Sequence, residues 1–290
     1  MKEQEPYWHA AIHQVMPALE IKDLVINHEG VVNDIVIVNK EWVFRFANGE
    51  YGQEMLDLEY QLMRHVAPSV RLSIPAPIIH DFGVIVYPYL TGEIFSRKLW
   101  LQLGEKHQQK LADQLGMFLQ ALHSIQSDNL EWEIPHTMAP VSHETWSEIY
   151  ERILIKVYPL LLPSQIKWAD ELFDPVINQA DFFDYEPKLI HGDLAPYHIL
   201  YDPGEKRISA VIDFWVAGMG DPAMDFGTLI SYYGESLVKK MDSSYLGYQK
   251  IIQRARFYAQ AVELQWVLMA VESGDKYWFT AHLGGARDIG

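Results

Sequence analysis

The stretch LIHGDLAPYHIL at residues 189–200, followed by VIDF at residues 211–214, decides the fold of this chain. Both pieces contain short apolar runs that are typical of buried strands, and each run adjoins polar residues. The carboxylates Asp193 and Asp213 and the histidine His198 are therefore expected at strand ends. A packed scaffold holds polar groups rigidly at such positions.

These residue types suit phosphoryl transfer, which needs a carboxylate to accept the proton of the attacking hydroxyl, ligands for Mg²⁺, and a cation for the phosphates. Asp193 fits the base, since it precedes His198 by the spacing that protein kinases use between the catalytic Asp and a metal-binding Asn. Asp213 fits the Mg²⁺ ligand, because a hard cation prefers carboxylate oxygen. His191 is expected to support the loop rather than react, and Gly192 permits its tight turn.

Read together, H-G-D-x-x-x-x-H-I-L at residues 191–200, V-I-D-F at residues 211–214 and GDPAMDF at residues 220–226 resemble the aminoglycoside/macrolide phosphotransferase family. The resemblance implies an α+β, protein-kinase-like fold with a small β-rich N-terminal lobe and a larger helical C-terminal lobe. It also implies ATP or GTP as co-substrate, together with Mg²⁺. It extends from about Val25 to the C-terminus.

The first part of the chain is predicted to be mixed, with strands dominating. Helical periodicity predicts helices at Tyr7–Leu19 and Gly52–Val66. Runs of Val, Ile and Phe predict a hairpin formed by Val31–Val38 and Glu41–Ala47, and a further strand at Ile85–Tyr89. The pattern changes after residue 90. We therefore expect a nucleotide-binding lobe at residues 1–89 and a catalytic and substrate-binding lobe at residues 90–290.

The second part is predicted to be rich in helices. Apolar spacing predicts them at Lys106–Ser124, Thr145–Leu161, Pro163–Phe182, Ala223–Tyr233 and Ser243–Glu272. Short strand-like pieces stand between them at Leu189–His191, Ile199–Tyr201 and Arg207–Asp213.

The family resemblance places the nucleotide-binding lysine at Arg45, in the run WVFRF at residues 42–46. Arginine binds phosphates through a planar fork rather than a compact ammonium. Its expected ion-pair partner is Glu59, with Glu54 as the alternative. From the residues alone, Arg45 also fits an outward-facing strand position between two phenylalanines.

Three further features of the nucleotide and metal site follow from the resemblance. The phosphate-covering loop is expected near Gly30, the single glycine of that segment, and the base near Tyr87, Tyr89 and Leu90. His198 stands where the family commonly has Asn, and neutral imidazole matches Mg²⁺ less well than an amide oxygen. His198 is thus a metal ligand, a group that supports one, or a core histidine.

Residues after the motifs are candidates for the acceptor site. Trp266, Tyr277 and Trp278 suit either core packing or the face of a sugar or macrolide ring. Glu235 and Glu263 could neutralise amino groups of an aminoglycoside, although a solvated helix face is the simpler explanation for most acidic residues of this region.

Two aspartates of the GDPAMDF segment are expected to be structural. Asp221 and Asp225 are candidates for holding the backbone amides of the catalytic loop or for capping a helix that begins at Ala223. Neither is expected to contact a substrate.

Composition restricts the partners. The chain has 290 residues, of which 49% are hydrophobic, and it has no cysteine, so it can bury a core and excludes disulfides and thiolate metal sites. Its net charge of −16 repels nucleic acid and suits a cationic small-molecule acceptor. The N-terminal sequence lacks a signal-peptide core, and no stretch approaches the roughly 20 apolar residues of a membrane span. We expect a cytoplasmic monomer or weak dimer without a membrane partner.

Three hypotheses remain at this point. The first is a phosphotransferase acting on an aminoglycoside, with a macrolide or a metabolic alcohol such as choline or homoserine as alternative acceptors. The second is a metallohydrolase, because His191, Asp193, His198 and Asp213 would also bind Zn²⁺. The third is a pseudokinase-like binding module, motivated by the substitutions at positions 45 and 198.

Overall fold

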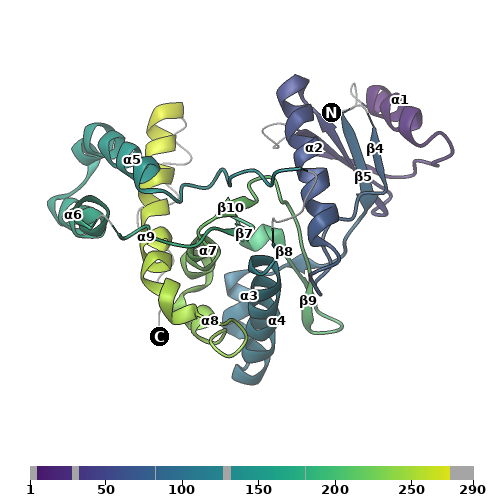
Figure 1. The fold of residues 1–290 in the computed structure, drawn as a ribbon. Helices are drawn as coiled ribbons and strands as arrows, with labels where there is room; N and C mark the ends of the chain where they lie inside the picture. The colour runs from purple at the N-terminus through teal and green to yellow at the C-terminus, as the bar shows by residue number, and fades with distance from the viewer. Residues whose placement is uncertain (1–4, 28–32, 82, 127–131, 180, 275–290) are drawn as a thin grey trace.

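The computed structural model shows an α+β chain in two parts (Figure 1) and describes residues 5–27, 33–81, 83–126, 132–179 and 181–274. The N-terminal part is an antiparallel sheet in the order β1-β2-β3-β5-β4. Its elements are α1 (Glu5–Val15), β1 (Leu24–Asn27), β2 (Asn33–Val38), β3 (Trp42–Ala47), α2 (Gly49–Val66), β4 (Ile79–Asp81) and β5 (Val84–Pro88).

The C-terminal part is mainly helical and contains a two-stranded sheet, β10-β7, and a three-stranded sheet, β6-β8-β9. Its first elements are β6 (Glu93–Ile94), α3 (Arg97–Gln102), α4 (Glu105–His123), α5 (His143–Lys156), the 3-10 helix η1 (Tyr158–Leu160) and α6 (Pro163–Asn178). Then follow β7 (Lys188–Ile190), the 3-10 helix η2 (Pro196–His198), β8 (Ile199–Asp202), β9 (Arg207–Val211), β10 (Gly218–Gly220), α7 (Ala223–Tyr233), α8 (Glu235–Lys239) and α9 (Tyr248–Ser273). The predicted fold class, a sheet followed by a helical part, is confirmed.

The hairpin β2-β3 organises the N-terminal sheet. Asn39 and Lys40 both have positive φ, 56° and 53°, as a two-residue turn matched to the twist of the strands requires. Alternation along β3 then separates two faces. Phe44 packs in a cluster with Trp8 and Ile12 of α1, and burial of each such side chain contributes about 2 kcal/mol. Arg45 lies on the opposite face.

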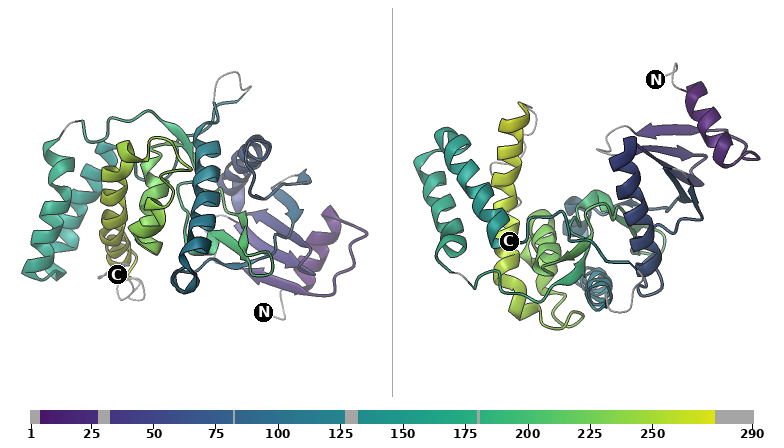
Figure 2. Two further views of the ribbon diagram at one scale, coloured as in Figure 1. Left: turned by 90° about the horizontal axis from the view of Figure 1, so that it is seen from below. Right: turned by 45° about the horizontal axis from the view of Figure 1, so that its top comes forward.

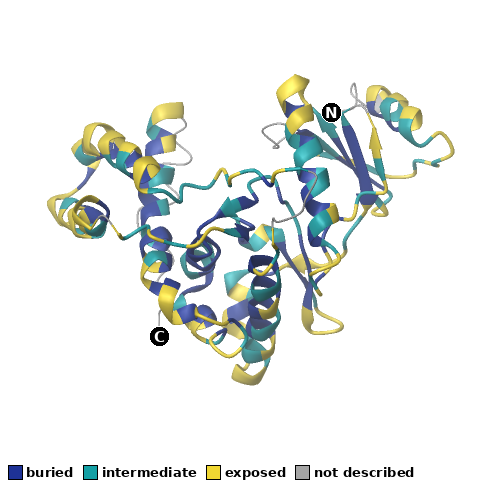
Figure 3. Ribbon diagram, in the orientation of Figure 1, coloured by how far each residue is buried: buried dark blue, intermediate teal, exposed yellow. Residues whose placement is uncertain are grey.

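The core of the C-terminal part lies around α4, α7 and α9 (Figure 3). The helices α7 and α9 approach closely at Gly227, where an added Cβ would lie only 2.6 Å from the Cβ of Tyr258. This contact excludes larger side chains at position 227. The buried face of α7 is thereby fixed against α9, and α7 carries the last aspartate of the sequence motif.

The strands β7 and β10 lie between the N-terminal sheet and the outer helices of the C-terminal part. In two orientations, α5, α6 and the C-terminal half of α9 lie on one side of these strands, and the five-stranded sheet lies on the other (Figure 2). Among the described helices, none is both long enough and apolar enough to cross a bilayer.

Several predicted boundaries were wrong. The helix predicted to reach Leu161 ends at Lys156 and is followed by η1, because a residue before proline, here Tyr158 before Pro159, disfavours the α conformation. The helix predicted to reach Phe182 ends at Asn178, and β9 ends at Val211. The short elements β1, β4, β6, β10 and α3 were not predicted, since so few residues carry no clear periodicity.

Candidate active site

The loop of residues 191–198 links β7 to β8 and carries the central polar residues of the motif. Gly192 has a φ of +81°, a left-handed conformation that glycine adopts without strain. Pro196 then opens η2, where its fixed φ suits the first helical position. The backbone therefore turns sharply and brings Asp193 beside His198.

His198 lies between the two carboxylates of the motif. Its Nδ1 donates to the backbone carbonyl of Asp193 at 2.8 Å and lies 3.5 Å from the Asp193 carboxylate. Its Nε2 lies 3.1 Å from Oδ2 of Asp213. Burial favours the neutral ring, but the hydrogen bond to Asp213 and the charges of both aspartates raise the pKa of His198. The two carboxylates therefore converge on one imidazole.

Asp213 is held in an unusual backbone conformation just after β9. Its φ is +68°, a left-handed conformation that is uncommon outside glycine, although Asp is among the residues that tolerate it. Burial alone would raise the pKa of Asp213, but the hydrogen bond from His198 and the charge of Arg45 lower it. Within the described residues, its buried Oδ1 has no hydrogen-bond partner. An ionised oxygen in this state fits an Mg²⁺ ligand.

The Asp193 carboxylate is accessible, and its pKa is raised. Its side chain is 39% exposed, so another molecule can reach the carboxylate. Partial burial raises the pKa of Asp193, and the charges of Asp213 and Asp225 add to this effect, while His198 opposes it. A carboxylate with a raised pKa is a stronger general base.

Arg45 and Glu59 form a buried ion pair beside this group. Arg45 is 5% exposed, and its Nη1 lies 2.5 Å from Oε1 of Glu59 on α2, whereas Glu54 is exposed. Burial would lower the pKa of Arg45, but the charges of Glu59 and Asp213 raise it. Burial also raises the pKa of Tyr87, to about 12, and its phenol hydrogen-bonds to Arg45. Arg45 therefore does not face solvent from the strand.

His191 and Asp225 support the loop from within. His191 is fully buried, its Nε2 donates to the carbonyl of Ile212 at 3.1 Å, and its Nδ1 accepts from the N–H of Asp193 at 3.3 Å. Burial lowers the pKa of His191 to about 4, so the ring is neutral. Asp225 accepts the backbone N–H groups of His191 at 3.0 Å and Gly192 at 2.7 Å.

Asp221 ties β10 to the helices α7 and α9. It accepts the N–H of Ala223 at 2.9 Å, which caps α7, and the hydroxyl of Tyr258 at 3.0 Å. Arg254 donates to both of its oxygens, at 2.6 and 3.2 Å. This buried carboxylate is fully satisfied.

The metallohydrolase hypothesis finds no support in this geometry. Across the described part of the chain, no three or more His, Asp or Glu side chains gather in an arrangement that could hold a metal ion. Both ring nitrogens of His191 are already bonded to the backbone. A Zn²⁺ site with three or four protein ligands is therefore not formed here.

The remaining predicted site residues are dispersed. Tyr89 and Leu90 are half-buried after β5, and the N–H of Tyr89 donates to the carbonyl of Glu41 at 2.8 Å. Glu235 is bonded to Arg256 through both oxygens and to Lys239. Glu263 and Trp266 lie on α9, buried and half-buried respectively. The other predicted positions, Gly30, Tyr277 and Trp278, lie outside the described residues.

The sequence interpretation missed two tyrosines beside Asp193. Tyr197 of η2 is 47% exposed and packs edge-on against His198, with ring centroids 4.4 Å apart. Burial and the charge of Asp193 raise the pKa of both Tyr197 and Tyr232, and their side chains hydrogen-bond to each other. Tyr197 stands inside the quoted motif and could have been noticed, whereas nothing in the sequence relates Tyr232 of α7 to it.

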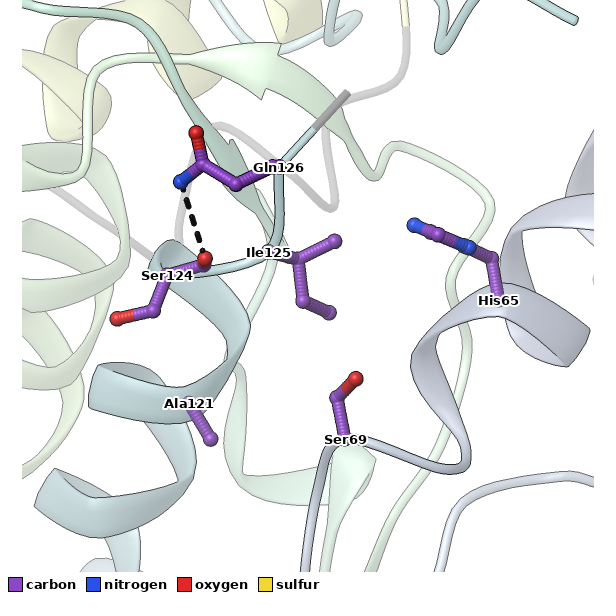
Figure 4. A pocket seen from close by; sticks show the side chains of 6 residues that line it. All are labelled: His65, Ser69, Ala121, Ser124, Ile125 and Gln126. Atoms are coloured by element: carbon purple, nitrogen blue, oxygen red, sulfur yellow. Dashed lines mark hydrogen bonds between the residues drawn. The ribbon is translucent and has the colours of Figure 1, made fainter. Parts of the chain in front are cut away.

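A pocket of about 480 Å³ lies elsewhere, between the C-terminal ends of α2 and α4 (Figure 4). It is lined by His65, Ser69, Ala121, Ser124, Ile125 and Gln126. None of these side chains belongs to the group around Asp193, so the pocket is not the candidate active site.

The described structure thus places a sheet with a buried Arg–Glu pair next to a helical part in which two carboxylates meet at a histidine. The sequence profile of the phosphotransferase enzyme family matches residues 23–258, and the chain belongs to this family.

Two curated proteins are similar to parts of this chain. Viomycin phosphotransferase of Streptomyces vinaceus is 28% identical over 102 residues, which cover 33% of each protein. Acyl-CoA dehydrogenase family member 11 of Pongo abelii is 23% identical over 188 residues, which cover 61% of this chain. The matched part of the chain thus spans about a third of the viomycin phosphotransferase and 23% of the acyl-CoA dehydrogenase family member.

Solved structures share the fold over nearly the whole chain. The GDP complex of a mutant aminoglycoside 2'-phosphotransferase superposes with a TM-score of 0.83 at 23% identity, covering 96% of this chain and 94% of the other. Macrolide 2'-phosphotransferase type I superposes with a TM-score of 0.68 at 18% identity, covering 94% and 95%. At these low identities the superpositions show a common fold alone, and both aminoglycoside and macrolide phosphotransferases occur among the neighbours.

Proposed function

We propose that this protein transfers the γ-phosphoryl group of ATP or GTP to a hydroxyl of a small molecule, and that the acceptor is an aminoglycoside. The observation that carries the proposal is the convergence of Asp193 and Asp213 on His198. Two carboxylates that meet at one imidazole can provide one group for the acceptor hydroxyl and another for the metal-bound phosphates.

Asp193 accepts the proton of the attacking hydroxyl, because its carboxylate is accessible and has a raised pKa. Asp213 would hold Mg²⁺ through Oδ1, which has no hydrogen-bond partner among the described residues, while His198 fixes the other oxygen. When bound, Mg²⁺ supplies positive charge to the phosphate oxygens. Because both ring nitrogens of His198 already have oxygen partners, His198 orients the two aspartates rather than binding Mg²⁺ directly.

The nucleotide lobe comprises residues 1–89 in this proposal, and residues 90–290 form the catalytic and substrate lobe. Arg45 binds the non-transferred phosphates, and Glu59 keeps its guanidinium directed toward Asp213. The base lies near Tyr87, Tyr89 and Leu90. Structural neighbours were determined with GDP and with ATP, which supports either nucleotide.

An aminoglycoside acceptor is supported by the net charge of −16 and by neighbours determined with kanamycin and gentamicin. One specific observation favours a macrolide as the second candidate. Glu235, expected to meet a substrate amino group, is already neutralised by Arg256 and Lys239. A less cationic acceptor could instead lie against the ring of Tyr197, which is exposed beside Asp193.

The test is an assay with Mg²⁺, ATP or GTP, and a panel of aminoglycosides, macrolides, choline and homoserine, which measures nucleoside diphosphate and phosphorylated acceptor. Wild-type protein is expected to phosphorylate an aminoglycoside. Nucleotide binding without turnover on any acceptor would instead support the pseudokinase-like module.

The variant Asp193→Ala is expected to lose about 10²–10⁴-fold in turnover, as removal of a general base does. Its unfolding midpoint should stay near that of wild type, because the side chain is partly exposed. Unchanged turnover in a folded Asp193→Ala protein would exclude this residue as the base.

A further inference from the structure

His123 is a buried polar residue at the C-terminal end of α4, and the proposed reaction does not yet use it. It is 4% exposed and packs against the rings of Phe226 and Tyr245. A buried imidazole is costly unless both of its nitrogens are hydrogen-bonded. The partners of this ring therefore matter.

Both ring nitrogens of His123 have a partner. Nε2 lies 3.0 Å from Oδ2 of Asp225, and Nδ1 lies 2.9 Å from the hydroxyl of Tyr245. Because a carboxylate only accepts, Nε2 must carry a hydrogen. The Tyr245 hydroxyl can donate to Nδ1 or accept from it, so this nitrogen has a partner in either case. The contact holds the ring so that Nε2 faces Asp225.

Asp225 connects His123 to the catalytic loop through hydrogen bonds. Its two oxygens accept the N–H groups of His191 and Gly192, the peptides directly before Asp193. Burial alone would raise the pKa of Asp225, but the hydrogen bond from His123 lowers it and keeps the carboxylate ionised. Without that donor, a proton on Asp225 would remove an acceptor from one of the two loop amides.

We propose that His123 and Tyr245 are positioning residues that act through Asp225 to hold the peptides before Asp193 in the geometry needed for phosphoryl transfer. The proposal rests on the proposed function of Asp193 and extends it to a chain of five groups: a phenol, an imidazole, a carboxylate and two backbone amides. Displacement of a general base by a fraction of its contact distance lowers turnover without weakening substrate binding.

The experiment compares three variants with wild type. His123→Leu removes the donor, His123→Gln keeps an amide N–H near the position of Nε2, and Tyr245→Phe removes only the hydroxyl. A matched control is His107→Leu on the same helix, since the His107 ring bonds to the carbonyl of Lys206 and not to the loop. For each protein we would measure kcat, both KM values, the unfolding midpoint and amide hydrogen exchange of a peptide containing residues 191–193.

His123→Leu is expected to lower kcat about 100-fold, with each KM changed less than about threefold, and to accelerate exchange at residues 191–193. His123→Gln should recover kcat to within about tenfold of wild type, and Tyr245→Phe should lie between wild type and His123→Leu. The control should match wild type. Full turnover in His123→Leu, or equal losses in the Leu and Gln variants, would overturn the proposal.

The exchange measurement separates this inference from the proposed function. If no acceptor is phosphorylated by wild type, the function fails, yet faster exchange at residues 191–193 in His123→Leu and protection in His123→Gln still support the positioning role. If wild type turns over and exchange at these amides is the same in all variants, only the positioning role fails.

Discussion

The four aspartates around the motif form two pairs with opposite environments. The side chains of Asp193 and Asp213 are 39% and 37% exposed, and one buried oxygen of Asp213 has no partner within the described residues. Asp221 and Asp225 are fully buried, and each accepts several hydrogen bonds from backbone amides and side chains.

This contrast teaches how the site divides its tasks. A buried charge with every oxygen satisfied stabilises one geometry and has nothing left to offer a substrate. A carboxylate with an open oxygen contributes less to the fold but can bind a cation or a proton. The two pairs should therefore respond differently to substitution, and the following variants test that difference.

The largest expected effect is that of Asp213→Ala. Removal of the proposed Mg²⁺ ligand should lower turnover by about 10³-fold or more, since the charge on the phosphates is no longer compensated. The free energy of unfolding should fall by only about 2 kcal/mol, because the contact with His198 is lost and alanine tolerates the left-handed φ of 68° less well than aspartate. Nucleoside diphosphate release over a Mg²⁺ titration and urea unfolding measure both quantities. Loss of stability with turnover intact would reverse the comparison.

Asp225→Asn should lower both stability and turnover. The substitution keeps the shape but removes the charge that His123 and two backbone amides share, so unfolding should become easier by about 3 kcal/mol. Turnover should fall about 100-fold through displacement of the loop. Asp202→Asn is the control, since Asp202 ends β8 and, among the described residues, its carboxylate accepts only from the following turn; this variant should stay within about 1 kcal/mol of wild type. A stable Asp225→Asn protein would show that the loop does not depend on this carboxylate.

Arg254→Met tests whether Asp221 is purely structural. The variant leaves a buried carboxylate without its cation, which should cost about 3 kcal/mol in unfolding, while turnover of the folded protein falls less than about tenfold. Arg256→Met, on the same helix, breaks an exposed pair with Glu235 and should cost less than about 1 kcal/mol. Turnover lost in Arg254→Met without loss of stability would place Asp221 nearer the reaction than we propose.

The smallest expected effect concerns the surface carboxylate Glu272, which joins α9 to α5. Hydrogen bonds from Arg152 and Lys156 lower the pKa of Glu272 from 4.5 to about 2. Since the folded pKa is the lower one, its stabilisation is present above pH 4.5 and is lost as the pH falls toward 2. The pair is at the surface, so it should amount to less than about 1 kcal/mol. Urea unfolding at pH 6 and pH 3 of wild type and Glu272→Gln measures this, and an equal pH dependence in both would contradict it.

Much of the fold could be predicted from local pattern. The hairpin around Asn39 and Lys40 is encoded by two strand-like runs and a two-residue turn, and α4 by a clear apolar face. The α+β fold class and the phosphotransferase family were predicted and are confirmed. Short elements such as β10 were not predicted, because three residues form a strand only when a partner strand is present.

The residues that support the site were harder to find. Tyr245 meets His123 across 122 positions of sequence, and Arg254 meets Asp221 across 33. No spacing rule relates such residues, because their contacts arise when α4, α7 and α9 pack together. The same holds for Glu235, whose neutralisation by Arg256 depends on how α8 meets α9.

The sequence by itself determined the order of the longer elements, the fold class, the family and the positions of the polar motif, since each depends on neighbours within a few residues of one another. The tertiary structure alone decided that Asp193 and Asp213 share one imidazole, that Arg45 turns inward to Glu59, and which carboxylates are already satisfied. The physical reason is that hydrogen bonds and charge compensation depend on distance in space, which chain packing sets.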